Sequence, residues 1–237
     1  MADFTLEEIN RYSRQFILDE MGVEGQLKMK QAKVLVVGAG GLGCPVLQYL
    51  AAAGVGTIGI IDFDKVEIHN LHRQILYTAN DIGKRKAPTA AQKVNTINPN
   101  VNCVVFDELL QEPNAASIIS QFDMVVDGTD NFLTRYLVND VCVLLNKPLV
   151  YGSVLKFEGQ LAVFNYNAGK NLRDIYPEPP NPEDVPNCDE IGVMGFVPGI
   201  IGTYMVNATV QVILGNYNNN CLLVFDFKTF GVTNIKL

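Results

Sequence analysis

The chain has 237 residues, of which 48% are hydrophobic and 18% charged, so it is apolar enough to bury a sizeable core and is not globally disordered. Its formal net charge of -7 argues against general binding to nucleic acid or to an anionic membrane, because the phosphate field would repel the surface. Five cysteines at irregular spacing, without a CxxC pair, argue against a disulfide framework and predict a reduced, cytoplasmic setting. We find no secretory signal pattern and no apolar run that approaches the ~20 residues of a membrane span.

Apolar side chains at helical spacing predict a helical arm over residues 5–31, and Thr5 and Glu8 have the spacing of a capping box. A short apolar run at 33–37 ends in Gly38, which is typical of a buried parallel strand. Strands and helices then alternate. The predicted strands are 57–62, 101–106, 124–127 and 148–152, and the predicted helices are 41–53, 86–97, 115–121 and 131–145. The alternation predicts a Rossmann-like, doubly wound α/β fold with a mainly parallel sheet.

After residue 152 the pattern changes to that of an antiparallel extension. Residues 159–166 predict a strand, and the high proline content of 166–190 predicts an extended loop. A helix at 200–214 and a final strand at 222–226 follow. We therefore expect a single domain over 1–237, with a helical arm (1–31), a nucleotide-binding core (32–152) and an extension (153–237) that contains a crossover loop (166–199).

The segment from Gly38 to Gly43 fits the G-x-G-x-x-G motif, and it follows a predicted strand and opens a predicted helix. Such a loop lets a phosphate approach backbone N–H groups and the helix dipole. Asp62 stands at the tip of the second strand, where its carboxylate can accept hydrogen bonds from both hydroxyls of a ribose. The pattern predicts a nucleotide site without distinguishing NAD, FAD and ATP, and the alternative is a tight turn that binds no ligand.

Charged residues near the other strand ends favour a triphosphate. Arg73 and Lys86 would hold and neutralise phosphate oxygens, although each taken alone is more typical of a solvated surface charge. Asp130 follows the fourth strand and either holds Mg²⁺ or caps the helix that starts at Asn131. We expect the neighbouring Lys84 and Arg85 to be surface charges.

The combined motifs closely resemble the ThiF/MoeB/HesA family of ubiquitin-activating-enzyme-like adenylyltransferases, from about Ile9 to Gly215. The likeness is carried by Arg11-Tyr12-Ser13-Arg14-Gln15, the glycine loop, Asp62-Phe63-Asp64, Asn70-x-x-Arg73-Gln74, Lys86 and Gly128-Thr129-Asp130-Asn131. The resemblance implies an ATP-dependent adenylyltransferase. Such an enzyme activates the C-terminal glycine of a ubiquitin-like sulfur carrier, ThiS-like or MoaD-like, as an acyl-adenylate in thiamine or molybdopterin cofactor biosynthesis.

The resemblance also implies roles for individual residues. Arg14 would reach the ATP of a neighbouring subunit, which implies a homodimer with shared sites, whereas alone it is typical of a surface arginine. The implied catalytic residues are Arg14, Arg73, Lys86 and Asp130, with Asp130 holding Mg²⁺. The residues implied to bind the nucleotide are Gly38, Gly40, Gly41, Asp62, Asp64, Asn70, Arg73, Gln74, Lys86, Asp130 and Asn131.

The sequence departs from the family pattern in its cysteines. Many members hold zinc in two CxxC pairs, but the place of the first pair reads Asn171-Leu172-Arg173-Asp174, so we expect no structural zinc. Cys188 matches a cysteine that some members use in thiol chemistry with the carrier, and the alternative is a bystander thiol, because the acids beside it disfavour the thiolate. No rhodanese-like domain is recognised, so we expect a separate sulfur donor.

Two other functions remain open at this point. An NAD-dependent oxidoreductase shares the glycine loop and Asp62 but leaves Arg73, Lys86 and Asp130 unexplained. A catalytically inactive nucleotide-binding scaffold shares all these features, although the intact set of cations argues against it.

Overall fold

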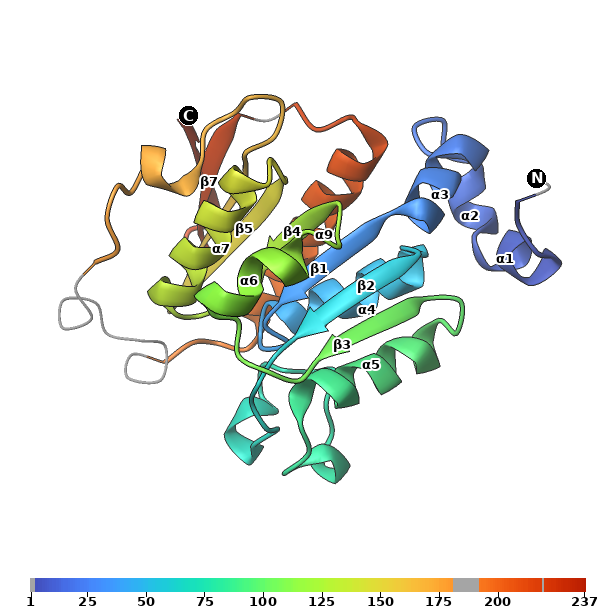
Figure 1. Cartoon of the computed structure of the whole chain (residues 1–237), viewed down its shortest axis with the longest axis horizontal. Helices are drawn as coiled ribbons and strands as arrows, with labels where there is room; N and C mark the ends of the chain where they lie inside the picture. Colours follow the sequence, from blue (N-terminus) through green and yellow to red (C-terminus); the bar gives the residue numbers. More distant parts are fainter. Residues whose placement is uncertain (1–2, 181–191, 219) are drawn as a thin grey trace.

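The computed structural model describes residues 3–180, 192–218 and 220–237, which form a mixed eight-stranded sheet with helices on both faces (Figure 1). The strand order is β3-β2-β1-β4-β5-β6-β7-β8. Neighbours from β3 to β5 pair in parallel, and those from β5 to β8 pair antiparallel. The predicted fold class, a doubly wound parallel core with an antiparallel C-terminal extension, is confirmed.

The strands and helices have these bounds in the structure. The strands are β1 (Lys33–Val37), β2 (Thr57–Ile61), β3 (Asn102–Phe106), β4 (Met124–Asp127), β5 (Leu149–Leu155), β6 (Glu158–Phe164), β7 (Cys221–Asp226) and β8 (Gly231–Lys236). The α-helices are α1 (Leu6–Arg11), α2 (Ser13–Phe16), α3 (Gly22–Gln31), α4 (Gly43–Ala53), α5 (Lys86–Ile97), α6 (Glu112–Ile119), α7 (Phe132–Leu144) and α9 (Phe196–Leu214). Three short 3-10 turns are η1 (Ile68–Asn70), η2 (Ala79–Asp81) and η3 (Leu172–Asp174).

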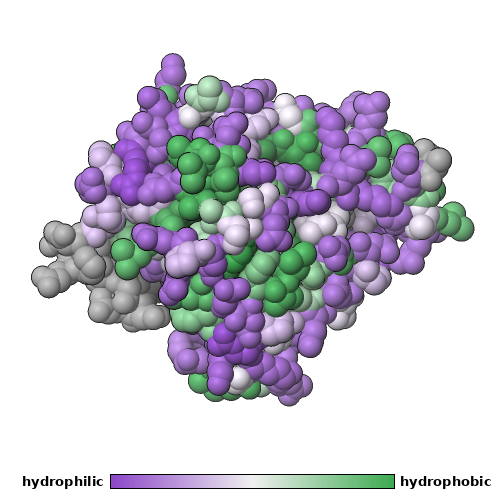
Figure 2. Space-filling model, viewed as in Figure 1, coloured by the Kyte–Doolittle hydropathy of each residue, from purple (hydrophilic) through white to green (hydrophobic). Residues whose placement is uncertain are grey.

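The sheet is the middle of three layers. Its central strands are short and apolar, and β4 is buried along its whole length, as expected of a strand covered on both faces. One cluster of core side chains joins the sheet to α3, α4, α5 and α9, and a second joins it to α6 and α7. In the view of Figure 2, the surface is largely hydrophilic, with apolar side chains gathered in several areas near the middle.

The N-terminal arm differs from the prediction of one helical stretch over 5–31. It consists of α1, α2 and α3, and α1 ends at Arg11, because the backbone of Tyr12 is no longer helical. The predicted capping box is confirmed, because the Thr5 hydroxyl accepts from Glu8 N and the Glu8 carboxylate accepts from Thr5 N.

The C-terminal extension also corrects the sequence analysis. The crossover loop predicted over 166–199 contains η3 and ends earlier, because α9 begins at Phe196 and tolerates Pro198 in its first turn, where no N–H partner is needed. The last strand is β8 and not β7. Its side chains are exposed along its whole length, so it lacks the apolar alternation that identifies a half-buried strand.

Helix α9 has 19 residues and a mean hydropathy of 1.4, so it is long and apolar enough to cross a membrane, although the sequence analysis found no such run. It packs against α4, β5 and β6, and 44% of its most apolar window is buried inside the protein. Core helices of globular proteins meet the same test, so α9 is weak support for a membrane span.

Candidate active site

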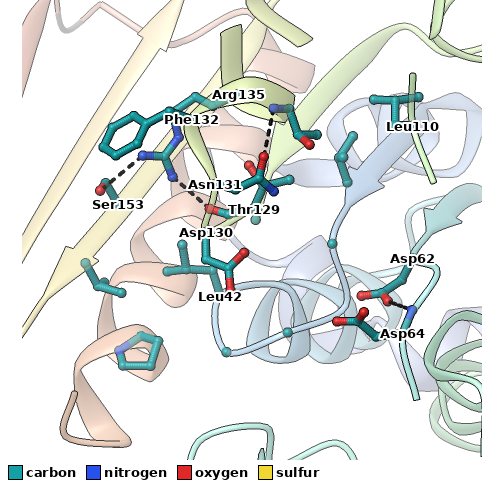
Figure 3. A pocket seen from close by; sticks show the side chains of 18 of the residues that line it. Leu42, Asp62, Asp64, Leu110, Thr129, Asp130, Asn131, Phe132, Arg135 and Ser153 are labelled. Carbon is teal, nitrogen blue, oxygen red and sulfur yellow. Dashed lines mark hydrogen bonds between the residues drawn. The ribbon is translucent and has the colours of Figure 1, made fainter. Parts of the chain in front are cut away.

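A cavity of about 590 Å³ lies at the carboxyl ends of the parallel strands (Figure 3). Strand order places the residues that follow these strands side by side, with Asp62 after β2, the glycine loop after β1, Asp130 after β4 and Ser153 near the end of β5. The order reverses between β1 and β4. Open α/β sheets bind ligands at this switch point, so the fold itself marks the cavity as the candidate site.

The glycine loop forms the floor between β1 and α4. Gly38 has a φ of +86°, a backbone conformation that residues with a side chain rarely adopt. A Cβ on Gly43 would lie 2.0 Å from the Gly38 carbonyl oxygen. Gly41 also lines the cavity, and a Cβ there would lie 3.2 Å from the Pro198 side chain. The missing side chains keep a cradle open at the N-terminus of α4, where an anion is favoured, so the loop fits a phosphate.

Asp62 ties the tip of β2 to this loop. One carboxylate oxygen accepts from Ala39 N and the other from Asp64 N, both at 2.8 Å. Burial raises the pKa of Asp62, and the nearby Lys86 ammonium opposes the shift. Each oxygen keeps a second lone pair, so the carboxylate can also accept from a ribose hydroxyl.

Lys86 is not a solvated charge. It is only 6% exposed at the start of α5, and its Nζ lies 2.8 Å from Asp64 Oδ2. Arg73 is half-buried and donates from Nη1 to the His69 carbonyl oxygen at 3.0 Å. Beside it, Gln74 is buried with an Oε1 that has no hydrogen-bond partner among the described residues. A buried amide oxygen without a partner in a cavity wall fits a ligand that completes its hydrogen bonds.

Asp130 does not cap α7. Asn131 is the N-cap, and its Oδ1 accepts from Thr134 N at 2.9 Å. The Asp130 side chain is exposed to the cavity and makes no hydrogen bond or ion pair within the described part of the chain (Figure 3). Of the two roles considered for Asp130, the cap is therefore wrong.

The described residues contain no group of three or more His, Cys, Asp or Glu side chains that could hold a metal ion. A lone carboxylate in a phosphate-binding cavity nevertheless fits Mg²⁺. This ion keeps several waters and is commonly held by one or two carboxylates together with substrate phosphates.

Arg135 is a wall residue that the sequence analysis missed. It is 5% exposed, and its Nε donates to Asp127 Oδ2 at 3.2 Å. One terminal nitrogen donates to the carbonyl oxygens of Thr129 and Gly152 at 2.7 and 3.1 Å, and the other donates to Ser153 Oγ at 3.3 Å (Figure 3). The buried acid that ends β4 was the available signal, because such a charge requires a cation from a neighbouring element.

Of the predicted site residues that the structure describes, two do not line the cavity. Asn70 is 6% exposed, and its side chain accepts from Glu67 N to close η1. Arg14 is exposed on α2. The arm packs against the C-terminal ends of α4 and α5, near the amino-terminal ends of the strands, whereas the cavity lies at their carboxyl ends (Figure 1). Cys188 lies outside the described residues.

The remaining walls are largely apolar and carry no motif that a single sequence reveals. They are formed by Phe63, Leu109, Leu110, Phe132, Leu133, Val154, Leu155, Pro179, Pro180 and Val193.

Comparison with known proteins gives two kinds of relatives. The chain is 51% identical over 232 residues to "Adenylyltransferase and sulfurtransferase MOCS3" of Culex quinquefasciatus. The aligned region covers 97% of this chain and 53% of that protein. It is 49% identical over 217 residues to "Sulfur carrier protein adenylyltransferase" of Thermus thermophilus, covering 90% of this chain and 80% of that protein. The chain thus spans about half the length of the MOCS3 relatives it matches.

Solved structures share the fold at low sequence identity. A crystal structure of PaaA superposes with a TM-score of 0.83 at 21% identity, over 98% of this chain and 74% of that one. Escherichia coli MccB crystallised with ATP gives a TM-score of 0.81 at 20% identity, over 96% of this chain and 71% of that one. The profile of the ThiF family matches residues 12–237, and with relatives at 51% and 49% identity this shows that the chain belongs to the ThiF family.

Proposed function

We propose that this chain is an ATP-dependent adenylyltransferase that activates the C-terminal glycine of a ubiquitin-like sulfur carrier. The observation that carries the proposal is the position of Lys86 and Asp130. The buried ammonium lies on the β2 side of the glycine loop, and the carboxylate without a partner among the described residues lies on the β4 side. An NAD site needs neither group, whereas a triphosphate with its metal ion uses both.

The reaction brings two anions together. An oxygen of the carrier's terminal carboxylate attacks the α-phosphorus of ATP and forms an oxygen–phosphorus bond. The bond from the α-phosphorus to the α,β-bridging oxygen breaks, and pyrophosphate leaves with that oxygen. Arg73 and Lys86 hold the phosphates and offset their charge, and the cavity orients the reactants, so no protein nucleophile is needed. Mg²⁺ held by Asp130 would neutralise further charge on the phosphate oxygens.

The names of the relatives support the acyl substrate. One is named a sulfur carrier protein adenylyltransferase, and another, from Porphyra purpurea, a probable molybdopterin-synthase adenylyltransferase at 49% identity over 239 residues. Both names agree with a small carrier as partner, ThiS-like in thiamine or MoaD-like in molybdopterin biosynthesis. We also propose that the enzyme works as a homodimer without structural zinc, and elemental analysis of the pure protein would test the latter.

Carrier-dependent ATP–pyrophosphate exchange tests the function. We expect the wild type to exchange with a purified ThiS-like or MoaD-like carrier ending in Gly-Gly, and Asp130→Ala to lose the exchange while it keeps the wild-type thermal transition. Asp123→Ala is the matched control. Asp123 lies just before β4 and accepts a hydrogen bond from Lys33 N at 2.8 Å, at the amino-terminal ends of the strands, whereas the cavity lies at their carboxyl ends. Near-normal exchange by Asp130→Ala would remove Asp130 from catalysis, and NADH binding in place of ATP binding would favour an oxidoreductase.

A further inference from the structure

The segment 171–180 connects the core beneath α7 to the cavity. It begins with η3, which buries Leu172 to 1% exposure in the same core cluster as α7. It ends with Pro179 and Pro180, which both line the cavity. Whatever fixes this segment therefore also fixes one wall of the site.

Prolines prevent the segment from joining the sheet. Pro177, Pro179 and Pro180 lack an N–H, so a backbone ladder cannot form, and the carbonyl oxygens need other donors. Helix α7 and η3 supply them. The Tyr136 hydroxyl, 2.8 Å from each of the Tyr176 and Glu178 carbonyl oxygens, shares its proton between them, and Arg173 Nη1 donates to the Pro177 oxygen at 2.8 Å.

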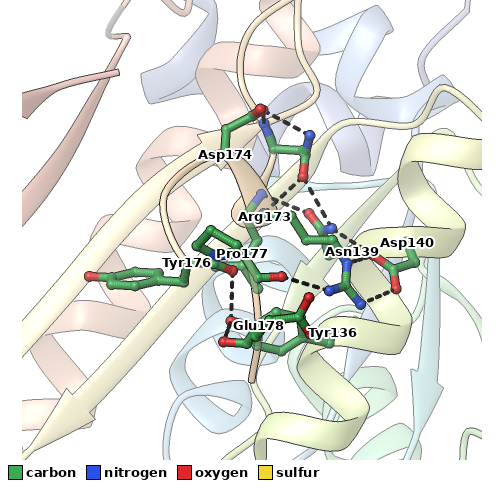
Figure 4. A network of polar contacts seen from close by, with 10 residues as sticks. Tyr136, Asn139, Asp140, Arg173, Asp174, Tyr176, Pro177 and Glu178 are labelled. Carbon is green, nitrogen blue, oxygen red and sulfur yellow. Dashed lines mark hydrogen bonds and ion pairs between the residues drawn. The ribbon is translucent and has the colours of Figure 1, made fainter. Parts of the chain in front are cut away.

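Arg173 is itself held by α7. Its Nε and Nη2 donate to the two carboxylate oxygens of Asp140 at 2.7 and 2.8 Å, and its guanidinium lies 4.9 Å from the centre of the Tyr136 ring. The bond from Arg173 lowers the pKa of Asp140. A planar two-bond contact of this kind fixes direction as well as distance. We call Arg173, Asp140 and Tyr136 the clamp (Figure 4).

The turn beneath the clamp is closed by its own polar side chains. Asn171 donates from N and from Nδ2 to Asp174 Oδ2, both at 2.8 Å, and its Oδ1 accepts from Arg173 N. Leu172 N donates to Asn139 Oδ1 of α7 at 2.9 Å. The first part of the segment is thus positioned before the chain reaches the prolines.

The wall built by the clamp lies at one end of the cavity. The ends of the strands follow in the order β2, β1, β4, β5, so Asp62 and Lys86 stand on the β2 side, whereas Val154 and Leu155 stand on the β5 side. Pro179 and Pro180 follow directly on the residues that the clamp bonds to α7, the helix that packs on β4. The candidate ribose and phosphate ligands Asp62 and Lys86 stand on the β2 side, and Asp130 stands between them and the β5 side, so the apolar wall is available to the other substrate.

We propose that the clamp positions the wall against which the C-terminal residues of the acyl substrate lie, which makes Arg173 a positioning residue for the carrier and not for ATP. This inference rests on the proposed adenylyltransferase function. Pro179 and Pro180 have a fixed backbone geometry and no N–H that could donate to the terminal carboxylate of an extended glycine tail. The carboxylate oxygens therefore stay free of hydrogen bonds from this wall and can attack the α-phosphorus.

The test separates the two substrates by their KM values in ATP–pyrophosphate exchange. We expect Arg173→Ala to raise the KM for a ThiS-like or MoaD-like carrier by about tenfold while the KM for ATP changes less than about twofold. Asp140→Ala should act in the same direction. The charge-reversed pair Arg173→Asp with Asp140→Arg restores the ion pair but not the bond to the Pro177 oxygen, so it should recover part of the carrier KM. Tyr136→Phe provides a milder variant if Arg173→Ala fails to fold.

Arg85→Ala is the matched control. Arg85 binds Asp107 at 2.7 Å with a side-chain exposure of 37%, close to the 38% of Arg173, but at the β3 edge. Its carrier KM should equal that of the wild type. An unchanged carrier KM in the clamp variants, an equal rise for both substrates, or no recovery on charge reversal would overturn the clamp. A wild type that exchanges with neither carrier would instead refute the proposed function.

Discussion

The buried pair of Arg135 and Asp127 fixes the backbone that carries Asp130. Asp127 is fully buried at the end of β4 and accepts from the backbone and hydroxyl of Thr129. Arg135 returns from α7 to bind Asp127, Thr129 and the end of β5. The metal-binding position that we propose therefore depends on a largely buried network, in which each charge compensates the other.

Removing one charge of this pair should lower the free energy of unfolding more than removing both charges. Arg135→Leu leaves the Asp127 carboxylate buried without its cation, and we expect the free energy of unfolding to fall by about 3–5 kcal/mol. The double variant Arg135→Leu with Asp127→Leu should regain most of that loss and still lack exchange activity, because the loop of Asp130 is no longer tied. Denaturant unfolding and ATP–pyrophosphate exchange measure the two effects. A double variant as unstable as the single one would show that the charge is not the cause.

Part of the site could be predicted from single residues. The glycine loop and Asp62 directly follow strand ends in sequence, and a parallel sheet brings the carboxyl ends of its strands together. Arg135 could not be predicted in this way, because its partners lie on β4 and β5 and its own position in a helix carries no motif. The role of Asn131 as the cap of α7, which leaves Asp130 without that role, likewise became visible only in the geometry.

Among the secondary-structure elements, the turn η2 lies between the loop that bears Arg73 and Gln74 and the helix α5. Asp81 in this turn is 3% exposed and accepts from Thr78 N at 3.0 Å. The ammonium groups of Lys84 and Lys93 lie 3.0 and 2.8 Å from its two oxygens. Since Lys93 belongs to α5, one carboxylate joins the loop that bears Arg73 and Gln74 to the helix that begins at Lys86.

The stability contributed by Asp81 should depend on pH. Hydrogen bonds from Lys93, followed by those from Lys84 and Thr78, hold the pKa of Asp81 well below its ordinary 3.8. A lowered carboxyl pKa stabilises the folded state fully above the unfolded value and loses that effect as the pH falls through the folded value. We expect Asp81→Asn to reduce the free energy of unfolding by about 2 kcal/mol at pH 7 and by progressively less below pH 3.8. Urea unfolding of both proteins from pH 6 to about pH 2 measures this, and a constant difference would contradict it.

Hydrophobic periodicity predicted the helices and strands of the nucleotide-binding core well and those of the C-terminal extension less well. Helix α5 and the strands β1 and β4 have the predicted bounds, because each is bordered by glycine, proline, asparagine or a charged residue. Strand β8 was missed because an exposed edge strand shows no apolar alternation. The start of α9 was missed because proline in a first turn looks, in sequence alone, like the end of a loop.

In the whole molecule, Arg14 lies on the surface of the N-terminal arm and does not line the cavity of its own chain. Tyr12 anchors the arm, because its ring is buried and its hydroxyl accepts from the Asn98 side chain at 2.8 Å, at the end of α5. Beside Arg14, the apolar side chains of Ile17 and Leu18 are 71% and 52% exposed. An anchored arm with an exposed cation and exposed apolar neighbours suits a contact with a second copy of the chain, in agreement with the proposed homodimer.

Mixing two inactive variants tests whether Arg14 acts across the dimer. We expect Arg14→Ala and Lys86→Ala each to lose exchange activity. After the two are mixed and allowed to exchange subunits, half of the dimers are heterodimers, and one of their two sites combines an intact Arg14 with an intact Lys86. Exchange should therefore recover to about a quarter of the wild-type value. If Arg14 acts within its own subunit, every site lacks one of the two cations and no activity returns, while sedimentation of the mixture shows independently whether dimers are present. Recovery would thus require both a second copy and a cation delivered from it, because no single subunit in the mixture holds a complete set of charges.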